Sequence, residues 1–275
     1  MMDSITSFFA KEGVIIVAFL EILLLRLGVF ALFILIAELL GRLLKKKDYK
    51  SFNCVWSVKN IVELFVIYTG FQALMIFFKG EVSQSSVEGF VLFWSFLEYI
   101  FLIVLVLYFV LQVYEGSLRT LGLITEDIKR DLVLSLQFLV YLGFGCAFLH
   151  ILHVYEFLKP SSKIIESVSL KTLFAGGAVA YAKCFLVLIV SPFAEEVFYR
   201  GFMYPVVRNK VGPVIASLLI SLFFAFIHFD PQFFVYIFIL SYVLCYLYEK
   251  GRSLVPPIII HSVYNLLVLL GLFNY

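Results

Sequence analysis

Charged residues are scarce in this sequence of 275 residues. Asp, Glu, Lys and Arg together make up 15% of the chain, while 63% of the residues are hydrophobic. Soluble globular domains have about 25% charged and about 45–50% apolar residues, so this composition excludes an ordinary soluble protein. The net charge is only +2 and the basic residues lie in short separate loops, which excludes the basic patch of a nucleic-acid-binding protein. We therefore predict an all-α polytopic membrane protein without a nucleic-acid partner.

Sequence signatures of metal sites and disulfide frameworks are also missing. The zinc-protease sequence His-Glu-x-x-His does not occur. Residues 1–13 lack the positive region of a cleavable signal peptide, so we expect the first apolar run to be retained as a membrane span. No Cys-x-x-Cys pair occurs, so we expect free thiols that pack as small hydrophobic groups at all four cysteines, Cys54, Cys146, Cys184 and Cys245.

Apolar runs of membrane-spanning length recur along the whole chain. A bilayer core needs about 20 residues of helix. The runs that approach this length predict about eight spans, at 14–38, 55–78, 90–113, 132–152, 172–198, 213–229, 232–248 and 254–273. Most of the loop lysines and arginines fall on one side of the membrane, which the positive-inside rule makes cytoplasmic, in the loops predicted at 41–50, 114–131, 199–212 and 249–253. Both termini are then expected outside.

The N-terminal half, residues 1–131, contains predicted spans and a cytoplasmic-side linker but no diagnostic motif. Two pairs of opposite charges have the i,i+4 spacing of neighbours on one helix face, Glu38 with Arg42 and Lys59 with Glu63. Three further charges have no partner at that spacing and must meet polar groups on other helices or extend to an interface, Glu21, Arg26 and Glu98. The candidate site therefore lies in residues 132–275.

Two adjacent glutamates follow the apolar run of the fifth predicted span. Glu196 and Arg200 have i,i+4 spacing in the favourable acid-first order, so their charges are expected to neutralise one another. Glu195 points about 100° away around the helix, and its carboxylate is left for chemistry. Pro192 has no backbone N–H, so we expect it to loosen the helix just before the glutamates and to leave carbonyl groups unbonded.

Polar residues on two later spans are expected to join this carboxylate. In the sixth span Phe224 and His228 lie on one helix stripe, and in the eighth span His261 and Asn265 lie on one face at i,i+4. Ionisable groups within a bilayer are costly, so such a cluster predicts a functional polar cavity. A glutamate and a histidine can jointly deprotonate water, which makes hydrolysis the natural reaction class.

The residues around the predicted water determine whether a metal is needed. His261 and Asn265 project from successive turns and can donate hydrogen bonds to the oxyanion of amide hydrolysis. Asn265 is a poor zinc ligand, and Arg200 beside a ligand cluster disfavours a dication, so we favour a site without metal. The alternative is a zinc ion held by Glu195, His228 and His261 with water as fourth ligand.

Three motifs in this half of the chain resemble those of a known family. Glu195-Glu196-Val-Phe-Tyr-Arg200, Phe224-Ala-Phe-Ile-His228 and His261-Ser-Val-Tyr-Asn265 are similar to the motifs EExxxR, FxxxH and HxxxN. These motifs belong to the CAAX-prenyl-protease and bacteriocin-processing family of intramembrane endopeptidases, which includes the type II prenyl endopeptidases. The resemblance covers about residues 170–270. It implies an all-helical membrane fold with four catalytic residues, Glu195 and His228 to activate water and His261 and Asn265 to stabilise the oxyanion, and three supporting residues, Glu196, Arg200 and Phe224.

The resemblance also implies a substrate class and a location. Its members cleave prenylated CAAX proteins or serve in peptide maturation and bacteriocin immunity, so we expect a lipidated or hydrophobic peptide substrate within the lipid membrane. The sequence of residues 194–201 resembles that of prokaryotic members, which implies a bacterial or archaeal plasma membrane. The positive-inside topology and the positions of the candidate residues along their spans predict an active site on the cytoplasmic side. The alternatives are a catalytically silent scaffold or immunity factor of the same fold and a transporter, although no internal repeat of the kind common in transporters is evident.

Overall fold

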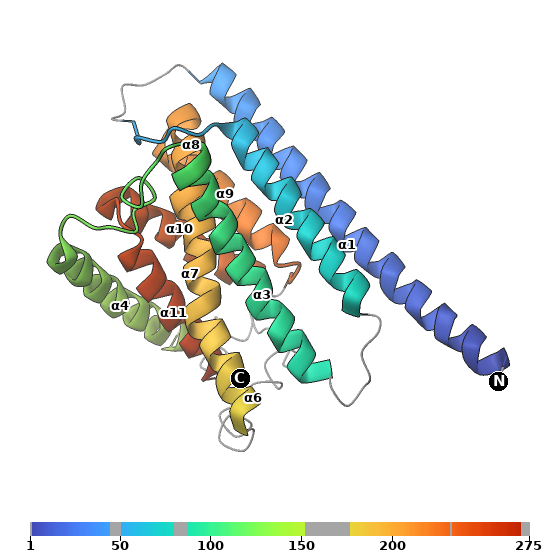
Figure 1. The fold of residues 1–275 in the computed structure, drawn as a ribbon. Helices are drawn as coiled ribbons and strands as arrows, with labels where there is room; N and C mark the ends of the chain where they lie inside the picture. Colours follow the sequence, from blue (N-terminus) through green and yellow to red (C-terminus); the bar gives the residue numbers. More distant parts are fainter. Residues whose placement is uncertain (1, 45–50, 80–86, 152–176, 232, 271–275) are drawn as a thin grey trace.

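The computed structural model describes residues 2–44, 51–79, 87–151, 177–231 and 233–270. All regular elements within these ranges are helices (Figure 1). In chain order they are α1 (Met2–Leu43), α2 (Val58–Lys79), α3 (Val87–Tyr108), the π-helix η2 (Phe109–Val113), α4 (Ile128–Ile151), α6 (Gly177–Phe185), the π-helix η5 (Leu186–Val190), α7 (Ser191–Glu196), the π-helix η6 (Val197–Met203), α8 (Tyr204–Val211), α9 (Pro213–Ile227), α10 (Phe234–Gly251) and α11 (Val255–Leu269). The predicted all-α fold is confirmed.

The helices are long and apolar enough for a polytopic membrane protein. Five described segments meet the length and composition of a membrane span, namely Leu23–Leu43, Val58–Met75, Gly89–Val113, Gly177–Val211 and Phe234–Gly251. Two shorter apolar helices, α9 and α11, coincide with predicted spans. The remaining predicted span, 132–152, lies on α4. About eight helical segments therefore correspond to the eight predicted spans, and their orientation in the membrane stays a prediction.

One predicted boundary is wrong. The loop expected at 199–212 is helical, because η6 and α8 continue the fifth span without a break as far as Val211. Arg200 and Arg208 are buried in this continuation, so they are not the solvated loop charges that the topology argument counted. Arg208 forms an ion pair with Glu249 of α10 at 2.8 Å. Internal ion pairing, which apolar windows cannot detect, allows these arginines to extend a helix that hydrophobicity alone would end.

Helix α9 is the centre of the bundle. Figure 1 shows α1 and α2 side by side on one flank and α4 with α11 on the other, with α3 and the long α6–α8 run between them. Helix α9 packs against α1, α8 and α10. Its Phe223 ring stacks on Phe33 of α1 at 4.9 Å between centroids, and Phe30 stacks on Phe65 of α2 at 3.8 Å. These buried rings hold the N-terminal helices against the half of the chain that carries the motifs.

A glycine turn directs α9 back along α8. Gly212 follows the last residue of α8 and has φ +84°, a conformation that glycine adopts without the Cβ penalty of other residues. Pro213 then begins α9, where its missing N–H costs no helical hydrogen bond. The turn places the stripe of α9 that ends in His228 across from α7 and the glutamates.

The segment before α2 is tied to the far end of α8. The Asn209 side chain accepts a hydrogen bond from the Phe52 backbone N–H and donates one to the Phe52 carbonyl, both at 2.9 Å. Trp56 donates from Nε1 to the Phe202 carbonyl at 2.7 Å.

The three cysteines whose side chains are described are free thiols, as expected, and burial raises the pKa of the Cys54 thiol. Cys146 lies outside the described side chains.

The charges of the N-terminal half follow the predictions in part. Lys59 and Glu63 form the expected i,i+4 pair at 3.5 Å. Glu38, however, forms its ion pair with Lys210 of α8 instead of the expected pair with Arg42. Packing of α1 against α8 brings this second lysine to the carboxylate, a neighbour that the local spacing could not reveal.

Candidate active site

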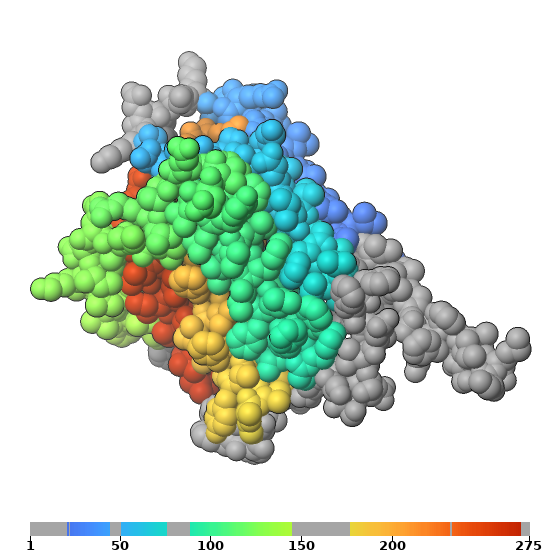
Figure 2. Space-filling model, in the orientation of Figure 1, coloured from blue at the N-terminus to red at the C-terminus, as the bar shows by residue number. Residues whose placement is uncertain are grey.

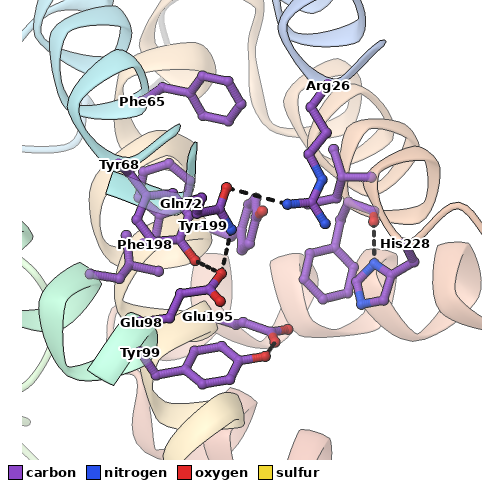
Figure 3. Close-up of a pocket in the computed structure, with 13 residues that line it drawn as sticks. Arg26, Phe65, Tyr68, Gln72, Glu98, Tyr99, Glu195, Phe198, Tyr199 and His228 are labelled. Atoms are coloured by element: carbon purple, nitrogen blue, oxygen red, sulfur yellow. Dashed lines mark hydrogen bonds between the residues drawn. The ribbon is translucent and has the colours of Figure 1, made fainter. Parts of the chain in front are cut away.

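A cavity of about 250 Å³ lies between the N-terminal helices and the motif-bearing helices. Figure 2 shows α3 and the segment after it covering one face of the molecule in front of the bundle. The lining comes in similar measure from both halves of the chain (Figure 3): Arg26, Phe65, Tyr68, Gln72, Glu98, Tyr99 and Leu102 from α1–α3, and Glu195, Phe198, Tyr199, Phe224, Ile227 and His228 from α7–α9 and the residues next to them. Aromatic rings and a few charged groups therefore share one partly open space. Of the four predicted catalytic residues, Glu195 and His228 line it, whereas His261 and Asn265 are not among its lining residues.

Glu196 and Arg200 form the ion pair that their spacing predicts. Arg200 Nη1 lies 2.7 Å from Glu196 Oε1, and both side chains are fully buried. The other end of the guanidinium donates from Nη2 to the Ser241 hydroxyl at 2.7 Å and to the Ser241 carbonyl at 3.1 Å. The guanidinium also lies 5.0 Å from the centre of the Phe224 ring. These contacts neutralise the Glu196 charge and connect η6 to α9 and α10.

Glu195 faces the cavity instead. Its Oε1 atom accepts hydrogen bonds from the Ser191 hydroxyl at 2.7 Å and the Tyr99 hydroxyl at 3.3 Å, and its side chain retains 14% exposure. Among the described residues, no lysine or arginine lies within ion-pair distance of this carboxylate. The 100° turn between adjacent helix positions thus separates the two glutamates, one held by a cation and one held by neutral donors.

His261 connects the two carboxylates. Its Nδ1 atom lies 2.8 Å from Glu196 Oε1, and its Nε2 atom lies 3.9 Å from Glu195 Oε2. The first distance is a hydrogen bond in which Nδ1–H donates to the charged carboxylate, which leaves Nε2 as the nitrogen that faces Glu195. The second distance is too long for a direct hydrogen bond. Sequence spacing placed His261 with Asn265 and gave no sign of its contact with Glu196.

Asn265 bonds to a carbonyl that Pro192 leaves without its helical donor. In η5 the Ser191 N–H bonds to the Leu186 carbonyl, five residues back. The next donor in this pattern would be residue 192, and proline has no N–H to give to Val187. Asn265 donates from Nδ2 to that Val187 carbonyl at 3.0 Å. The loosening expected at Pro192 is therefore present as a π-helix, and Asn265 is fixed by it.

His228 lies at the C-terminal end of α9 and lines the same cavity as Glu195. Its Nδ1 atom is 2.6 Å from the Phe224 carbonyl (Figure 3), so Nδ1 donates and Nε2 is the nitrogen with a lone pair. The Phe224 ring lies 4.6 Å from the His228 ring and 6.0 Å from the His261 ring, measured between centroids. Phe224 thus separates the two histidines, which makes it a spacer in the site.

The alternative zinc site is not assembled in the described part of the chain. There, no group of three His, Cys, Asp or Glu side chains is arranged to hold a metal ion. Both histidines use Nδ1 for a hydrogen bond and leave Nε2 free, but the Phe224 ring lies between the two imidazoles. In this arrangement the proposed ligand set of Glu195, His228 and His261 is not gathered around one point.

A second polar network in the cavity was not predicted from the motifs. Glu98 accepts hydrogen bonds from the Tyr68 hydroxyl at 2.8 Å and from the Gln72 amide, and Gln72 in turn accepts one from Arg26 Nη1 at 3.3 Å. The expectation that Arg26 and Glu98 meet polar groups on other helices is confirmed, whereas the Glu21 side chain is exposed. The signal in the sequence was the lack of an i,i+4 partner, which indicated cross-helix contacts and could not name them.

Comparison with known proteins supports the expected family. Residues 177–267 match the family described as type II CAAX prenyl endopeptidase Rce1-like. The chain is also 26% identical over 113 residues to UPF0177 protein YxdF of Lactococcus lactis subsp. lactis (strain IL1403), an alignment that covers 40% of this chain and 62% of that protein. No solved structure matches the chain significantly. The family resemblance predicted from the three motifs is thus confirmed over residues 177–267, which contain all of them.

Proposed function

We propose that this protein is an intramembrane endopeptidase that hydrolyses a peptide bond of a lipidated, CAAX-type, or hydrophobic peptide. One observation carries the proposal: among the described residues, no lysine or arginine lies within ion-pair distance of the Glu195 carboxylate in the cavity, while the adjacent Glu196 is neutralised by Arg200. A transporter or a scaffold has no evident need for this difference between neighbouring carboxylates. A hydrolase needs it, because a general base must be able to accept a proton.

In the proposed reaction, Glu195 removes a proton from water as the water oxygen bonds to the scissile carbonyl carbon. A water molecule between Glu195 Oε2 and His261 Nε2, which are 3.9 Å apart, can lie within hydrogen-bond distance of both atoms. When the tetrahedral intermediate collapses, the C–N bond breaks and Glu195 returns the proton to the leaving nitrogen. The products are a carboxylic acid and an amine, and the carboxylate is regenerated.

The histidines and Asn265 have distinct proposed roles. His228, whose Nδ1 donates to the Phe224 carbonyl, offers Nε2 as a second acceptor for the attacking water. With a proton on both ring nitrogens, His261 would donate from Nε2 to the oxyanion, while the hydrogen bond from Nδ1 to Glu196 orients the ring. Asn265 keeps one amide N–H beyond the one bonded to Val187. Loss of one such oxyanion donor lowers kcat by about 100- to 1,000-fold in other hydrolases.

The proposed setting is the plasma membrane of a bacterium or archaeon, with the site on the cytoplasmic side. The apolar helices and the aromatic cavity wall suit a substrate that arrives from the lipid phase, as a prenylated or hydrophobic peptide would. The protein is proposed to work without a metal, because the described residues of the site do not form a ligand set.

The test is cleavage of farnesylated, geranylgeranylated and unmodified hydrophobic peptides by purified protein in lipid nanodiscs, read by mass spectrometry. We expect wild type to cleave at least one peptide and Glu195→Gln to lose cleavage while it still inserts. Glu126→Gln is the matched control, because Glu126 is exposed and pairs only with exposed Arg119. Cleavage that persists in Glu195→Gln would contradict the proposed base, and inactivity of wild type on every peptide would favour the silent scaffold or immunity factor.

A further inference from the structure

Arg26 brings a positive charge into the cavity from a helix outside the family match. It lies on α1 within the apolar span Leu23–Leu43, where a charged side chain is costly unless it has a function or a partner. Figure 3 shows its guanidinium reaching into the space that Glu195, Glu98 and His228 also line. Both carboxylates in this space have other partners, since Glu195 accepts from neutral hydroxyl groups and Glu98 accepts from a tyrosine and a glutamine.

Few hydrogen-bond acceptors of the described residues contact this guanidinium. Arg26 Nη1 donates to Gln72 Oε1 at 3.3 Å, and the guanidinium lies 5.7 Å from the centre of the Phe229 ring. Its Nε atom is buried without a hydrogen-bond partner, and in the described part of the chain no carboxylate lies within ion-pair distance of it. Since a guanidinium has five N–H donors, Arg26 retains donors for a ligand.

The Gln72 side chain lies between Arg26 and the carboxylate of Glu98. Its amide oxygen accepts from Arg26 and its amide nitrogen donates to Glu98, whose charge is also met by Tyr68. Glutamine is neutral, so the arrangement satisfies Glu98 with hydrogen bonds and leaves Arg26 without a direct ion pair among the described residues. A planar guanidinium in this state matches a carboxylate, which can accept two parallel hydrogen bonds.

The cavity indicates which carboxylate would enter. Its volume of about 250 Å³ lies just below the 300–1,000 Å³ typical of small-molecule sites, so it admits the end of a peptide more readily than a folded segment. We propose that Arg26 binds the free C-terminal carboxylate of the peptide substrate in this cavity. This inference rests on the proposed function, because it places the substrate's end in the cavity that contains Glu195.

The experiment measures binding separately from cleavage. The probe is a fluorescent S-farnesyl-cysteine peptide with three apolar residues after the cysteine, made with a free C-terminal acid or a C-terminal amide. Binding is measured by anisotropy on nanodisc-embedded Glu195→Gln protein, which cannot consume the probe. We expect the acid to bind about 10- to 100-fold more tightly than the amide, the range expected for a charge-assisted bidentate pair.

Substitutions at Arg26 then test the residue. Adding Arg26→Gln should reduce the acid-to-amide ratio to about one, and Arg26→Lys should retain part of it because the charge remains. Arg42→Gln is the matched control, since Arg42 is an exposed arginine at the end of the same helix. Equal binding of acid and amide, binding of neither, or a preference that survives in a folded Arg26→Gln protein would overturn the inference. If Arg26→Gln fails to fold, the inference is tested by the acid-to-amide affinity ratios of the Glu195→Gln parent protein and of its Arg26→Lys variant.

Cleavage by wild type separates this inference from the proposed function. If wild type cleaves acid and amide probes at the same rate, the endopeptidase proposal stands and the role of Arg26 is wrong. If the acid is bound preferentially through Arg26 and neither probe is cleaved, carboxylate binding stands and the peptidase proposal loses its support for this substrate class.

Discussion

Glutamate to glutamine at position 196 is expected to destabilise the protein, whereas the same change at position 195 is expected to inactivate it. Both substitutions keep the side-chain shape and remove one negative charge, and the two residues are adjacent in the chain. Glu196 lies 2.7 Å from Arg200, and both are fully buried. Glu195 faces the cavity, and no described lysine or arginine lies within ion-pair distance of it. The pair therefore tests whether one charge is structural and the other chemical.

The magnitude follows from what each substitution leaves behind. Glu196→Gln leaves the Arg200 charge buried and unpaired, a change that costs about 3–5 kcal/mol in proteins. At roughly 2–4 °C per kcal/mol for a chain of this size, the melting temperature should fall by about 6–20 °C. Glu195→Gln strands no cation, so its unfolding free energy should change by less than about 1 kcal/mol. Catalytic activity is expected to respond in the opposite way: Glu195→Gln loses it, because the amide at position 195 cannot accept the proton.

The assay combines thermal unfolding in detergent with peptide cleavage at a temperature where both variants are folded. Glu196→Gln should keep part of its activity, since its amide oxygen can still accept the His261 hydrogen bond. A double variant, Glu196→Gln with Arg200→Met, removes the stranded charge and should recover most of the lost stability. Equal activities of two well-folded single variants, or no difference between their melting temperatures, would refute the division of roles.

Individual contacts of the site and its surroundings give three further predictions. Tyr99→Phe removes the 3.3 Å hydrogen bond to Glu195 and should lower kcat by about 3- to 30-fold, equivalent to roughly 0.6–2 kcal/mol, because the bond from Ser191 still holds the carboxylate; unchanged kcat would contradict a role in orienting the base. Trp56→Phe removes a buried 2.7 Å bond to the Phe202 carbonyl and should cost about 0.5–1.5 kcal/mol of unfolding free energy, the net contribution of one hydrogen bond, with cleavage retained below the transition. Prolonged treatment with a zinc chelator should leave cleavage unchanged; stoichiometric zinc whose removal abolishes activity and whose return restores it would refute the metal-free mechanism while leaving the peptidase proposal intact.

The sequence predicted the helices and the central pairing because both depend on local spacing. Apolar runs mark spans wherever no buried ion pair interrupts them, and a described helix overlaps each of the eight predicted segments. The Glu196–Arg200 pair follows from the 3.6-residue period of a single helix, and the separation of Glu195 follows from the same period. Neither argument required knowledge of which helices are neighbours.

Contacts between helices could not be predicted from local spacing. The helix that replaces the predicted 199–212 loop depends on two ion pairs, Arg208 with Glu249 and Lys210 with Glu38, whose members are far apart in the sequence. The contact of His261 with Glu196 depends likewise on α11 packing against α7. Local spacing determines the face of a helix on which a side chain lies. Helix packing determines which residues that face contacts. The sequence could therefore place the catalytic candidates on faces without assigning their partners.

The origin of the cavity walls suggests how one reaction can serve different substrates. The proposed base and both proposed histidines lie within residues 177–267, the part of the chain that matches the family. The opposite wall, with Arg26, Gln72 and Glu98, comes from α1–α3, outside that match. The chemistry requires the first wall to be kept, because loss of the base ends hydrolysis. The second wall contacts what is bound and can change without removing the base, so specificity is most readily altered there.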